Sequence, residues 1–425
     1  MSIGNLDIDE FKRILQRNLT PAEAISDPHY LRGRGTKLRQ IDRAFNSPGM
    51  HVFIYGDRGV GKTSLAQSAA VLRQSADAQP LVVACDQEAG FFKLVQDIVA
   101  KCVPPLEMIE IRKKSKGFSL KLPGISYEIG KSIENKAIPL PSSINEAVSF
   151  LSFVRQFHSK EPVIIIDEFD QLKEARDKKY FADLIKQTSD QHLGIRMIFC
   201  GISSSLEELI GAHLSTDRYL TPIELERLNH DARWEIVSSV ARELDIKINR
   251  EYLIRIGYIS DDFPYYVHLI AEKIFWEMYD DDDILLACHS RHFKSGVNDA
   301  VASAQTTLRL AYDRATQKYS DDYQEVLWAV ADDVMLRRQV SDIYSNSYMR
   351  IINERIADDK NPRKILDKTQ FYNRMNSLRT ERHGSILVAK GAGWYEFREN
   401  VVRGYVRLRA ESQGIELGRD HFAPA

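Results

Sequence analysis

Long hydrophobic runs and paired cysteines are both missing from this sequence of 425 residues. No stretch approaches the roughly 18 consecutive apolar residues of a membrane-spanning helix, and the acidic N-terminus lacks the apolar core of an export signal. The four cysteines, Cys85, Cys102, Cys200 and Cys288, form no C-x-x-C pair, which favours buried thiols in a reducing compartment. The sequence therefore predicts a cytoplasmic protein with no membrane partner.

A strong charge of one sign is also lacking. The net charge is −2, which says little by itself, so the distribution of charge along the chain matters more. Hydrophobic residues make up 44% of the chain and charged residues 28%, which is the composition of a globular protein. The length exceeds that of one ordinary hydrophobic core, so two or three domains are expected.

Several glycines lie close together in the stretch GDRGVGKTS at residues 56–64. This stretch fits G-x-x-x-x-G-K-[ST], and it lies between an apolar run at 51–55, which predicts a strand, and a predicted helix from 65. Strand, glycine loop and helix in that order are the context that a phosphate-binding loop requires. The residues expected to bind a nucleotide are Gly56, Asp57, Arg58, Gly59, Val60, Gly61, Lys62, Thr63 and Ser64.

Two of these residues have specific expected roles. The glycines allow backbone N–H groups to surround the phosphates, and the N-terminus of the following helix adds positive potential. Lys62 is expected to contact the β- and γ-phosphates and to act in catalysis, and Thr63 is expected to bind Mg²⁺.

A second motif consists of four apolar residues at 163–166 followed by Asp167 and Glu168. A strand this hydrophobic is buried on both faces, so it places Asp167 at the sheet edge where the phosphates would lie. Asp167 is expected to orient Mg²⁺ and Glu168 to polarise the water that attacks the γ-phosphate. Alone, the motif fits a buried strand with a polar end equally well. Together with the glycine loop, it indicates a P-loop nucleoside triphosphatase.

Two further catalytic candidates are less specific. The predicted strand at 195–200 runs into Ser203, Ser204 and Ser205, and Ser203 or Ser204 could lie between the water and the γ-phosphate, with Ser204 as the catalytic candidate. The serines could also cap the next helix, and the two interpretations are compatible. Arg218 is a candidate arginine finger that acts on a neighbouring subunit; a plain surface arginine is the alternative.

Apolar runs alternate with helical stretches in the first half of the chain, which predicts an α/β fold with a parallel sheet covered on both faces. The runs lie at 52–55, 81–84, 163–166, 197–200 and, more weakly, 220–225. Alternating residues at 104–141 predict a hairpin-like insertion with a basic first half. That insertion could contact a partner or DNA, or could be a solvated decoration.

The second half of the chain is predominantly helical up to a short alternating segment. Three helical patterns, a two-stranded ribbon with a glycine turn and a closing helix are typical of a winged helix. The predicted organisation is an N-terminal extension at 1–28, an ATPase core at 29–228, a helical lid at 229–318, a winged-helix domain at 319–412 and a tail at 413–425.

Basic residues are concentrated near the C-terminus. Residues 337–409 contain 16 Lys and Arg against 8 Asp and Glu, an excess of eight in a chain whose net charge is −2. Such a concentration is typical of nucleic-acid binding, although a winged helix can instead bind proteins and leave a solvated basic face. The third helix of a winged helix enters the major groove. The candidate contacts to double-stranded DNA are Lys368, Gln370, Asn373, Arg374, Arg379 and Lys390.

Together these residues resemble an AAA+ ATPase, and more narrowly the replication-initiator (origin-recognition-like) ATPases and the related STAND ATPases. The resemblance covers about residues 29–410. The stretch YLRGR at 30–34 is similar to the family's box that lines the adenine pocket, which implies a nucleotide contact by Arg34. Initiators usually carry a sensor arginine in the third lid helix, whereas residues 259–267 contain none. Pro264 in that stretch resembles the G-x-P element of STAND lids, which implies that it contributes to nucleotide binding.

The resemblance implies ATP and Mg²⁺ as cofactors, slow hydrolysis of ATP and assembly into a homo-oligomer. One expected function is a switch that engages DNA through the winged helix and recruits or loads a protein partner. The alternative is an ATPase regulator of an antiphage defence system whose winged helix binds protein partners. A third possibility is an ATP-binding scaffold that scarcely hydrolyses.

Overall fold

A computed structural model of the chain describes residues 3, 6–75, 78–88, 90–102, 139–213, 216–283, 285–316, 322–358 and 365–418. The predicted hairpin-like insertion lies almost entirely outside these residues. By its contacts the chain forms two units. One comprises Ala24–Gly56 and Gly61–Leu225, and the other comprises Met1–Glu23, Asp57–Val60 and Glu226–Ala425. No helix in the described part of the chain is long and apolar enough to cross a membrane.

The first unit is built on a five-stranded sheet in the order β2-β3-β4-β1-β5, in which every pair of neighbours is parallel. The predicted α/β fold with a parallel sheet is therefore confirmed. The strands lie close to the predicted apolar runs: β1 (His51–Tyr55), β2 (Leu81–Ala84), β3 (Val163–Asp167), β4 (Arg196–Gly201) and β5 (Leu220–Glu224). From β1 the chain crosses to β2 at the far side of the sheet and then returns through β3 and β4 to lie beside β1. The direction of the connections therefore reverses beside β1. In open α/β sheets, ligands bind at such a reversal, beyond the carboxyl ends of the strands.

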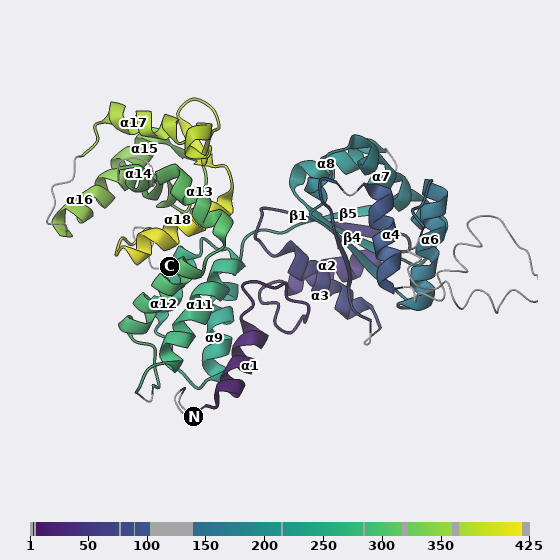
Figure 1. Ribbon diagram of the computed structural model, residues 1–425, viewed down its shortest axis with the longest axis horizontal. Coiled ribbons are helices and arrows are strands. Elements are labelled where there is room, and N and C mark those ends of the chain that lie inside the picture. The colour runs from purple at the N-terminus through teal and green to yellow at the C-terminus, as the bar shows by residue number, and fades with distance from the viewer. Residues whose placement is uncertain are drawn as a thin grey trace, which may run out of the picture. The chain divides into compact units, whose positions relative to one another are not determined.

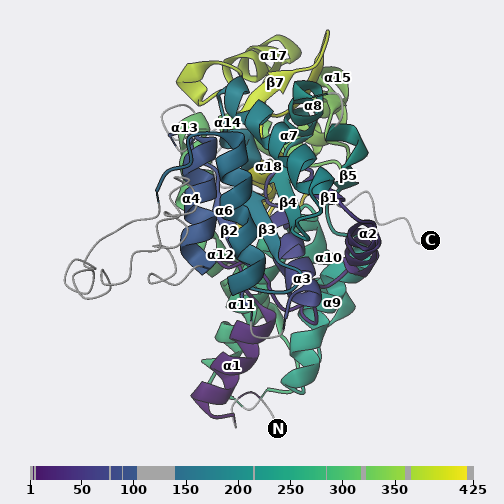
Figure 2. The ribbon, with the colours of Figure 1, turned by 90° about the vertical axis from the view of Figure 1, so that its right-hand side faces the viewer.

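Helices cover both faces of this sheet (Figure 1). On one side lie α2 (Gly35–Asn46) and α3 (Lys62–Arg73), and on the other lie α4 (Phe91–Cys102), α6 (Ile144–Phe157) and α7 (Ala175–Asp190). Figure 2 looks onto the second layer, with α4 and α6 in front of the sheet. Four fully buried rings pack under this layer, mostly edge to face: Phe53, Phe169, Phe181 and Phe199. Aromatic pairs in this geometry add about 0.5–1.5 kcal/mol each beyond their burial, so they fix the sheet against the helices.

The second unit begins with a group of helices: α9 (His230–Glu243), α10 (Arg250–Ile259), α11 (Pro264–Tyr279), α12 (Ser290–Ser303) and α13 (Thr306–Thr316). The first helix of the chain, α1 (Ile8–Asn18), packs onto this group. The Phe11 ring stacks on Tyr279 at 4.3 Å between centroids and meets Trp276 edge-on at 5.0 Å. Helix α1 is therefore a packed part of this unit.

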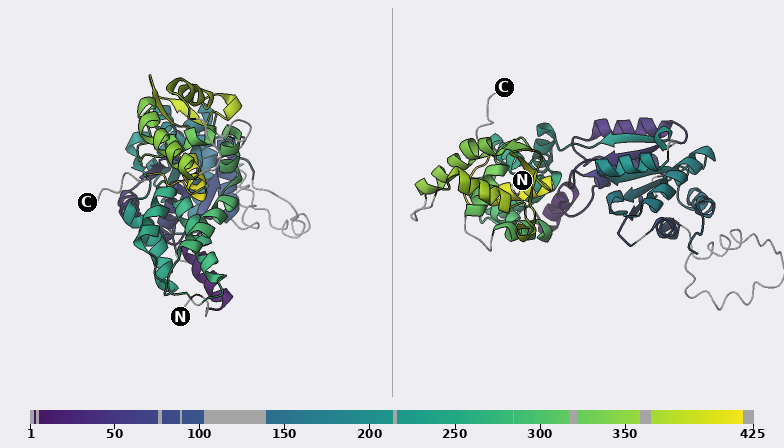
Figure 3. Two further views of the ribbon diagram at one scale, coloured as in Figure 1. Left: turned by 90° about the vertical axis from the view of Figure 1, so that its left-hand side faces the viewer. Right: turned by 90° about the horizontal axis from the view of Figure 1, so that it is seen from above.

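The rest of the second unit consists of further helices and a small antiparallel sheet. The helices and helical turns are α14 (Asp322–Ala331), α15 (Val340–Asp342), η6 (Ile343–Tyr348), α16 (Met349–Asp358), α17 (Lys368–Ser377), η7 (Glu381–His383) and α18 (Asn400–Ser412). The predicted two-stranded ribbon is present as β7 (Leu387–Ala389) and β8 (Trp394–Phe397), and β6 (Arg338–Gln339) adds a third strand beside β8. In Figure 3 the yellow α18 lies among the green helices of its own unit, where it contacts α10, α12, α13 and α14.

Candidate nucleotide-binding site

The predicted phosphate-binding loop connects β1 to α3. Gly61 is the N-cap residue of α3 and has a φ of 93°, in the left-handed region that glycine adopts without strain. Lys62 is the first residue of the helix, and its Nζ donates a hydrogen bond to the Gly56 carbonyl oxygen at 3.0 Å. No side chain caps α3 at its N-terminus. The positive end of a helix dipole is favourable for an anion such as a phosphate.

The two predicted motifs meet at the end of β3. The Thr63 hydroxyl donates a hydrogen bond to Asp167 Oδ2 at 2.7 Å, and the Glu168 backbone N–H donates to Asp167 Oδ1 at 2.9 Å. Both carboxylate oxygens of Asp167 are thus oriented by neighbouring groups. A hydroxyl and a carboxylate are the oxygen ligands that Mg²⁺ prefers, so the residues present fit this ion. Thr63 and Asp167 lie far apart in the sequence, and the parallel sheet brings them together.

Glu168 directly follows Asp167 and is exposed to solvent. Its φ is 53°, which places a non-glycine residue in the left-handed region. This conformation costs roughly 1–2 kcal/mol, and such strain is concentrated at functional sites. The turn lets the chain leave β3 abruptly and begin η4 (Phe169–Gln171), so the Glu168 carboxylate stays at the carboxyl edge of the sheet.

The serines after β4 also lie at this edge. Gly201, the last residue of β4, is paired with Tyr55, the last residue of β1, so α8 (Ser203–Ala212) begins beside the start of the phosphate-binding loop. The interpretation of the serines as an N-cap is wrong, because the N-cap residue is Ile202 and no side chain caps the helix. Ser204 lies exposed in the first turn of α8, so its catalytic role remains a prediction.

Arg218 lies at the amino ends of the strands, opposite the edge of the sheet that carries the glycine loop. It ends η5 (Thr216–Arg218), just before β5, and Leu220 at the start of β5 pairs with His51 at the start of β1. A strand rises about 3.3 Å per residue, so five residues of strand separate Arg218 from the edge that carries the glycine loop. Arg218 is exposed and could act only on the nucleotide of another copy of the chain, as the finger hypothesis requires.

Two residues near the loop have surroundings that the sequence did not indicate. Ser64 Oγ accepts a hydrogen bond from the Ile25 backbone N–H at 3.1 Å, and Ser68 Oγ donates to the Ile25 carbonyl at 3.1 Å. These two bonds hold Ile25, which precedes the predicted adenine box, against α3. Arg34 within that box is buried and is the N-cap residue of α2.

The second unit holds the loop tip Asp57–Val60 and the turn before Pro264. Pro264 is the first residue of α11, where its missing N–H costs nothing. Asp261 and Asp262 in the turn both lie in the left-handed region, with φ of 48° and 66°. Candidate residues Asp57, Arg58, Gly59, Val60 and Pro264 thus belong to this unit by their contacts, whereas Gly56, Gly61, Lys62, Thr63 and Ser64 belong to the other.

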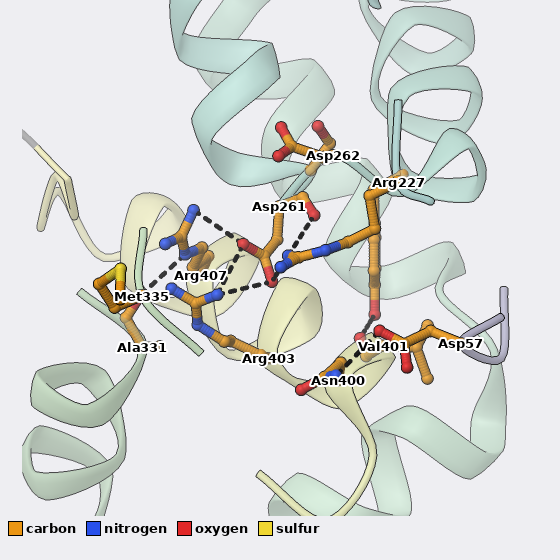
Figure 4. Close-up of polar contacts among 12 residues, drawn as sticks. Asp57, Arg227, Asp261, Asp262, Ala331, Met335, Asn400, Val401, Arg403 and Arg407 are labelled. Carbon is orange, nitrogen blue, oxygen red and sulfur yellow. Dashed lines mark hydrogen bonds and ion pairs between the residues drawn. The ribbon is translucent and has the colours of Figure 1, made fainter. Parts of the chain in front are cut away.

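Three arginines surround the Asp261 carboxylate, a cluster that sequence reasoning missed (Figure 4). Arg403 Nη1 lies 3.0 and 3.2 Å from the two oxygens, Arg407 Nη1 lies 3.2 Å from Oδ1 and Arg227 Nη1 lies 3.1 Å from Oδ2. Burial, and then the charge of Arg407, lower the pKa of Arg403 to about 9. The only sequence signal was the spacing of Arg403 and Arg407, which places both on one face of a helix.

The DNA-contact candidates differ in their exposure and in the contacts that they make within the chain. Gln370 completes a capping box with Asp367 at the start of α17, and Arg374 donates to Asp322 at 2.9 Å. Lys390 lies 3.1 Å from Glu396. The exposed candidates are Lys368, Asn373, Arg379 and Lys390. Three of the counted basic residues are instead buried, so the surface excess of positive charge is smaller than the sequence count: Arg338, Arg403 and Arg407.

The sheet order, the glycine loop and the Thr63–Asp167 contact define a P-loop fold of the AAA+ type. The family model of the AAA ATPase domain matches residues 30–198, about two fifths of the chain. No curated protein matches the sequence. Among solved structures, the Walker-type ATPase PABY2304 of Pyrococcus abyssi is 16% identical with a TM-score of 0.50, covering 91% of this chain and 99% of its own. The ORC2 protein of Aeropyrum pernix is 14% identical with a TM-score of 0.47, covering 95% and 98%. At 16% identity the likeness to the Pyrococcus abyssi ATPase shows the fold alone.

Proposed function

We propose that this protein binds ATP with Mg²⁺, hydrolyses it slowly and uses the two states as a switch. The contact of Thr63 with Asp167 carries the proposal, because it joins the two motifs into one site for a metal-bound triphosphate. Lys62 stabilises the charge on the transferred phosphoryl group, and Glu168 holds the attacking water. Mg²⁺, when bound by Thr63 and Asp167, neutralises charge on the phosphate oxygens.

Two substitutions test this proposal. Lys62→Ala removes a charged hydrogen bond to phosphate and should weaken ATP binding about 10- to 100-fold. Glu168→Gln keeps the size of the side chain but not the base, so turnover should fall about 10²- to 10⁴-fold while ATP affinity is retained. Unchanged ATP affinity in the first variant would sink the nucleotide site. Equal turnover in this variant and the unmodified protein would remove Glu168 from catalysis, and negligible turnover in both would favour the scaffold interpretation.

The proposal includes an oligomer in which Arg218 completes the site of a neighbour. The position of Arg218 at the opposite edge of the sheet from the glycine loop supports this geometry. Arg218→Ala and Glu168→Gln should each be inactive alone. A mixture should recover activity, because a Glu168→Gln subunit supplies an intact arginine to an Arg218→Ala subunit. No recovery in the mixture, with both variants still assembling, would refute the finger.

We further propose that residues 319–412 act as a winged helix that engages double-stranded DNA and brings a protein partner to it. The exposed Lys368, Asn373, Arg379 and Lys390 support the DNA contact. Changing Lys368 or Arg379 to alanine should weaken DNA binding and reduce the slope of its salt dependence by about one phosphate contact each. Glu381→Gln is a nearby control. No DNA affinity at low salt, with and without ATP, would overturn this part.

The second candidate function is a regulator, such as one in antiphage defence, whose C-terminal region binds protein. Two exposed aromatic side chains favour it: Trp394 on β8 is 39% exposed and Tyr372 on α17 is 44% exposed. The Arg337 guanidinium lies over the Trp394 ring at 5.2 Å, an arrangement common in protein interfaces. If Trp394→Ala leaves DNA binding intact but abolishes the regulatory effect of the protein in cells, such as resistance to phage, the regulator interpretation is supported.

A further inference from the structure

The last helix in the described part of the chain, α18, begins at the tip of the phosphate-binding loop, within the same unit. Asn400, its first residue, donates a hydrogen bond from Nδ2 to Asp57 Oδ2 at 2.9 Å (Figure 4). Glu399, the residue before it, lies 3.9 Å from Arg58 Nη1. Val401 follows and packs against Gly59, so three consecutive residues of the helix start meet three consecutive residues of the tip.

Gly59 shows how close this contact is. A Cβ at this position would lie 3.2 Å from Val401 Cγ2 and 3.5 Å from Phe263 Cδ1. Its φ of 84° also belongs to the left-handed region. Both the left-handed backbone and the lack of room for a side chain therefore favour glycine at position 59. The lack of room is caused by Val401 of α18 and by Phe263.

Helix α18 is firmly held, which allows it to act as a support. The Tyr266 hydroxyl donates to the Val401 carbonyl at 2.7 Å, and the Tyr266 ring packs on Gly404. Arg403 and Arg407 bind the Asp261 carboxylate, and Arg407 also donates to the carbonyls of residues 258, 331 and 333 at 2.7–2.8 Å. The Tyr266, Asp261, Arg403 and Arg407 side chains are buried, so the first turn of α18 is fixed relative to the turn before α11.

We propose that Asn400 is a positioning residue of the phosphate-binding loop, and that α18 pre-organises the tip Asp57–Val60 for nucleotide. This inference rests on the proposed ATP site. A glycine-rich loop loses conformational entropy for each residue that a ligand orders, and contacts already present reduce that cost. The amide donor of Asn400 also holds and partly screens the Asp57 carboxylate, whose charge opposes an incoming triphosphate. By linkage, bound nucleotide strengthens the contact of α18 with the tip.

An exchange of the two side chains tests the proposal. In the full-length protein, Asn400→Asp places two carboxylates together and should weaken Mg-ADP and Mg-ATP binding about tenfold or more. Asn400→Ala, which only loses the bond, should weaken both about three- to tenfold. The double variant Asp57→Asn/Asn400→Asp restores a donor and an acceptor with their roles reversed, and affinity should return to within about threefold of the unmodified protein. Ser412→Ala, at the other end of α18, is the control and should change nothing.

The outcomes separate the two levels of the proposal. If the unmodified protein binds no nucleotide, the proposed function fails and this inference fails with it. If the unmodified protein binds but Asn400→Asp and Asn400→Ala bind equally well or more tightly, the inference alone is overturned. A double variant that folds normally but does not recover affinity overturns it as well, because a merely structural effect of Asn400 would not be rescued by exchange.

Discussion

Asp261 is the residue at which we expect a single substitution to lower the stability of the second unit most. Asp261 is 3% exposed and compensates three guanidinium groups, of which that of Arg403 is 1% exposed. Asp261→Asn removes the charge but keeps an oxygen acceptor and nearly the same volume. Asparagine also tolerates the left-handed backbone that Asp261 adopts, so the change isolates the charge from backbone strain.

Removing one partner of a buried ion pair costs about 3–5 kcal/mol, because the other charge remains buried and uncompensated. We expect about 3 kcal/mol for Asp261→Asn, since the amide oxygen keeps one acceptor. With a urea m value of about 3 kcal/mol per M, the unfolding midpoint should fall by about 1 M. All four tryptophans of the chain lie in the second unit, so tryptophan fluorescence follows this unit separately from the sheet.

Asp262→Asn is a matched control for this measurement. Asp262 is the next residue, has the same left-handed backbone and pairs with Arg233, and its side chain is 37% exposed against 4% for that of Asp261. Water screens this partly exposed pair, so Asp262→Asn should cost clearly less stability than Asp261→Asn. If Asp261→Asn is no more destabilising than Asp262→Asn, the three arginines do not depend on this carboxylate and the reasoning is refuted.

Two further predictions concern buried groups. Burial lowers the pKa of His268 to about 4, so the folded state keeps this ring neutral while the unfolded chain takes up a proton below about pH 6.5. The stability that this group contributes is therefore complete above pH 6.5 and is lost as the pH falls towards 4, by about 2 kcal/mol at pH 5. A His268→Gln variant should lose less free energy of unfolding between pH 7 and pH 5 than the unmodified protein. An equal loss would contradict the buried, neutral state of His268. Gly404→Ala places a Cβ against the Tyr266 ring and should destabilise the second unit by about 1–3 kcal/mol in thermal unfolding. Gly211 lies in another helix with open space around it, so Gly211→Ala should be neutral or slightly stabilising. Similar effects of the two substitutions would count against the steric argument.

The sheet and the centre of the site could be predicted because their signals are local. The Val and Ile run of β3 has the length and uniformity of a strand buried on both faces, and the loop at 56–63 is a motif whose chemistry fixes its neighbours. The meeting of Thr63 and Asp167 then follows from the topology of parallel strands, since their carboxyl ends share one edge.

The parts that could not be predicted depend on residues far apart in the chain. Arg403 and Arg407 were counted as surface charge, because spacing alone does not reveal that Asp261 receives them. Strand β6 has two residues, too short for any periodicity to appear. The serines after β4 suggested a cap, but α8 begins earlier, and the buried Ser205 packs against Gly201 instead.

The Asp261 cluster and the loop tip are joined through α18, so a defect in one should reach the other. Asp261 lies in no nucleotide motif, yet it holds Arg403 and Arg407, and the first turn of the same helix holds Asp57 and Gly59. Asp261→Asn should therefore weaken Mg-ADP binding about three- to tenfold under conditions where the variant remains folded, whereas Asp262→Asn should not. Titration calorimetry well below the unfolding midpoint measures this directly. If Asp261→Asn loses stability as expected but binds nucleotide like the unmodified protein, then α18 can loosen without disturbing the tip, and pre-organisation of the loop must come from its own backbone.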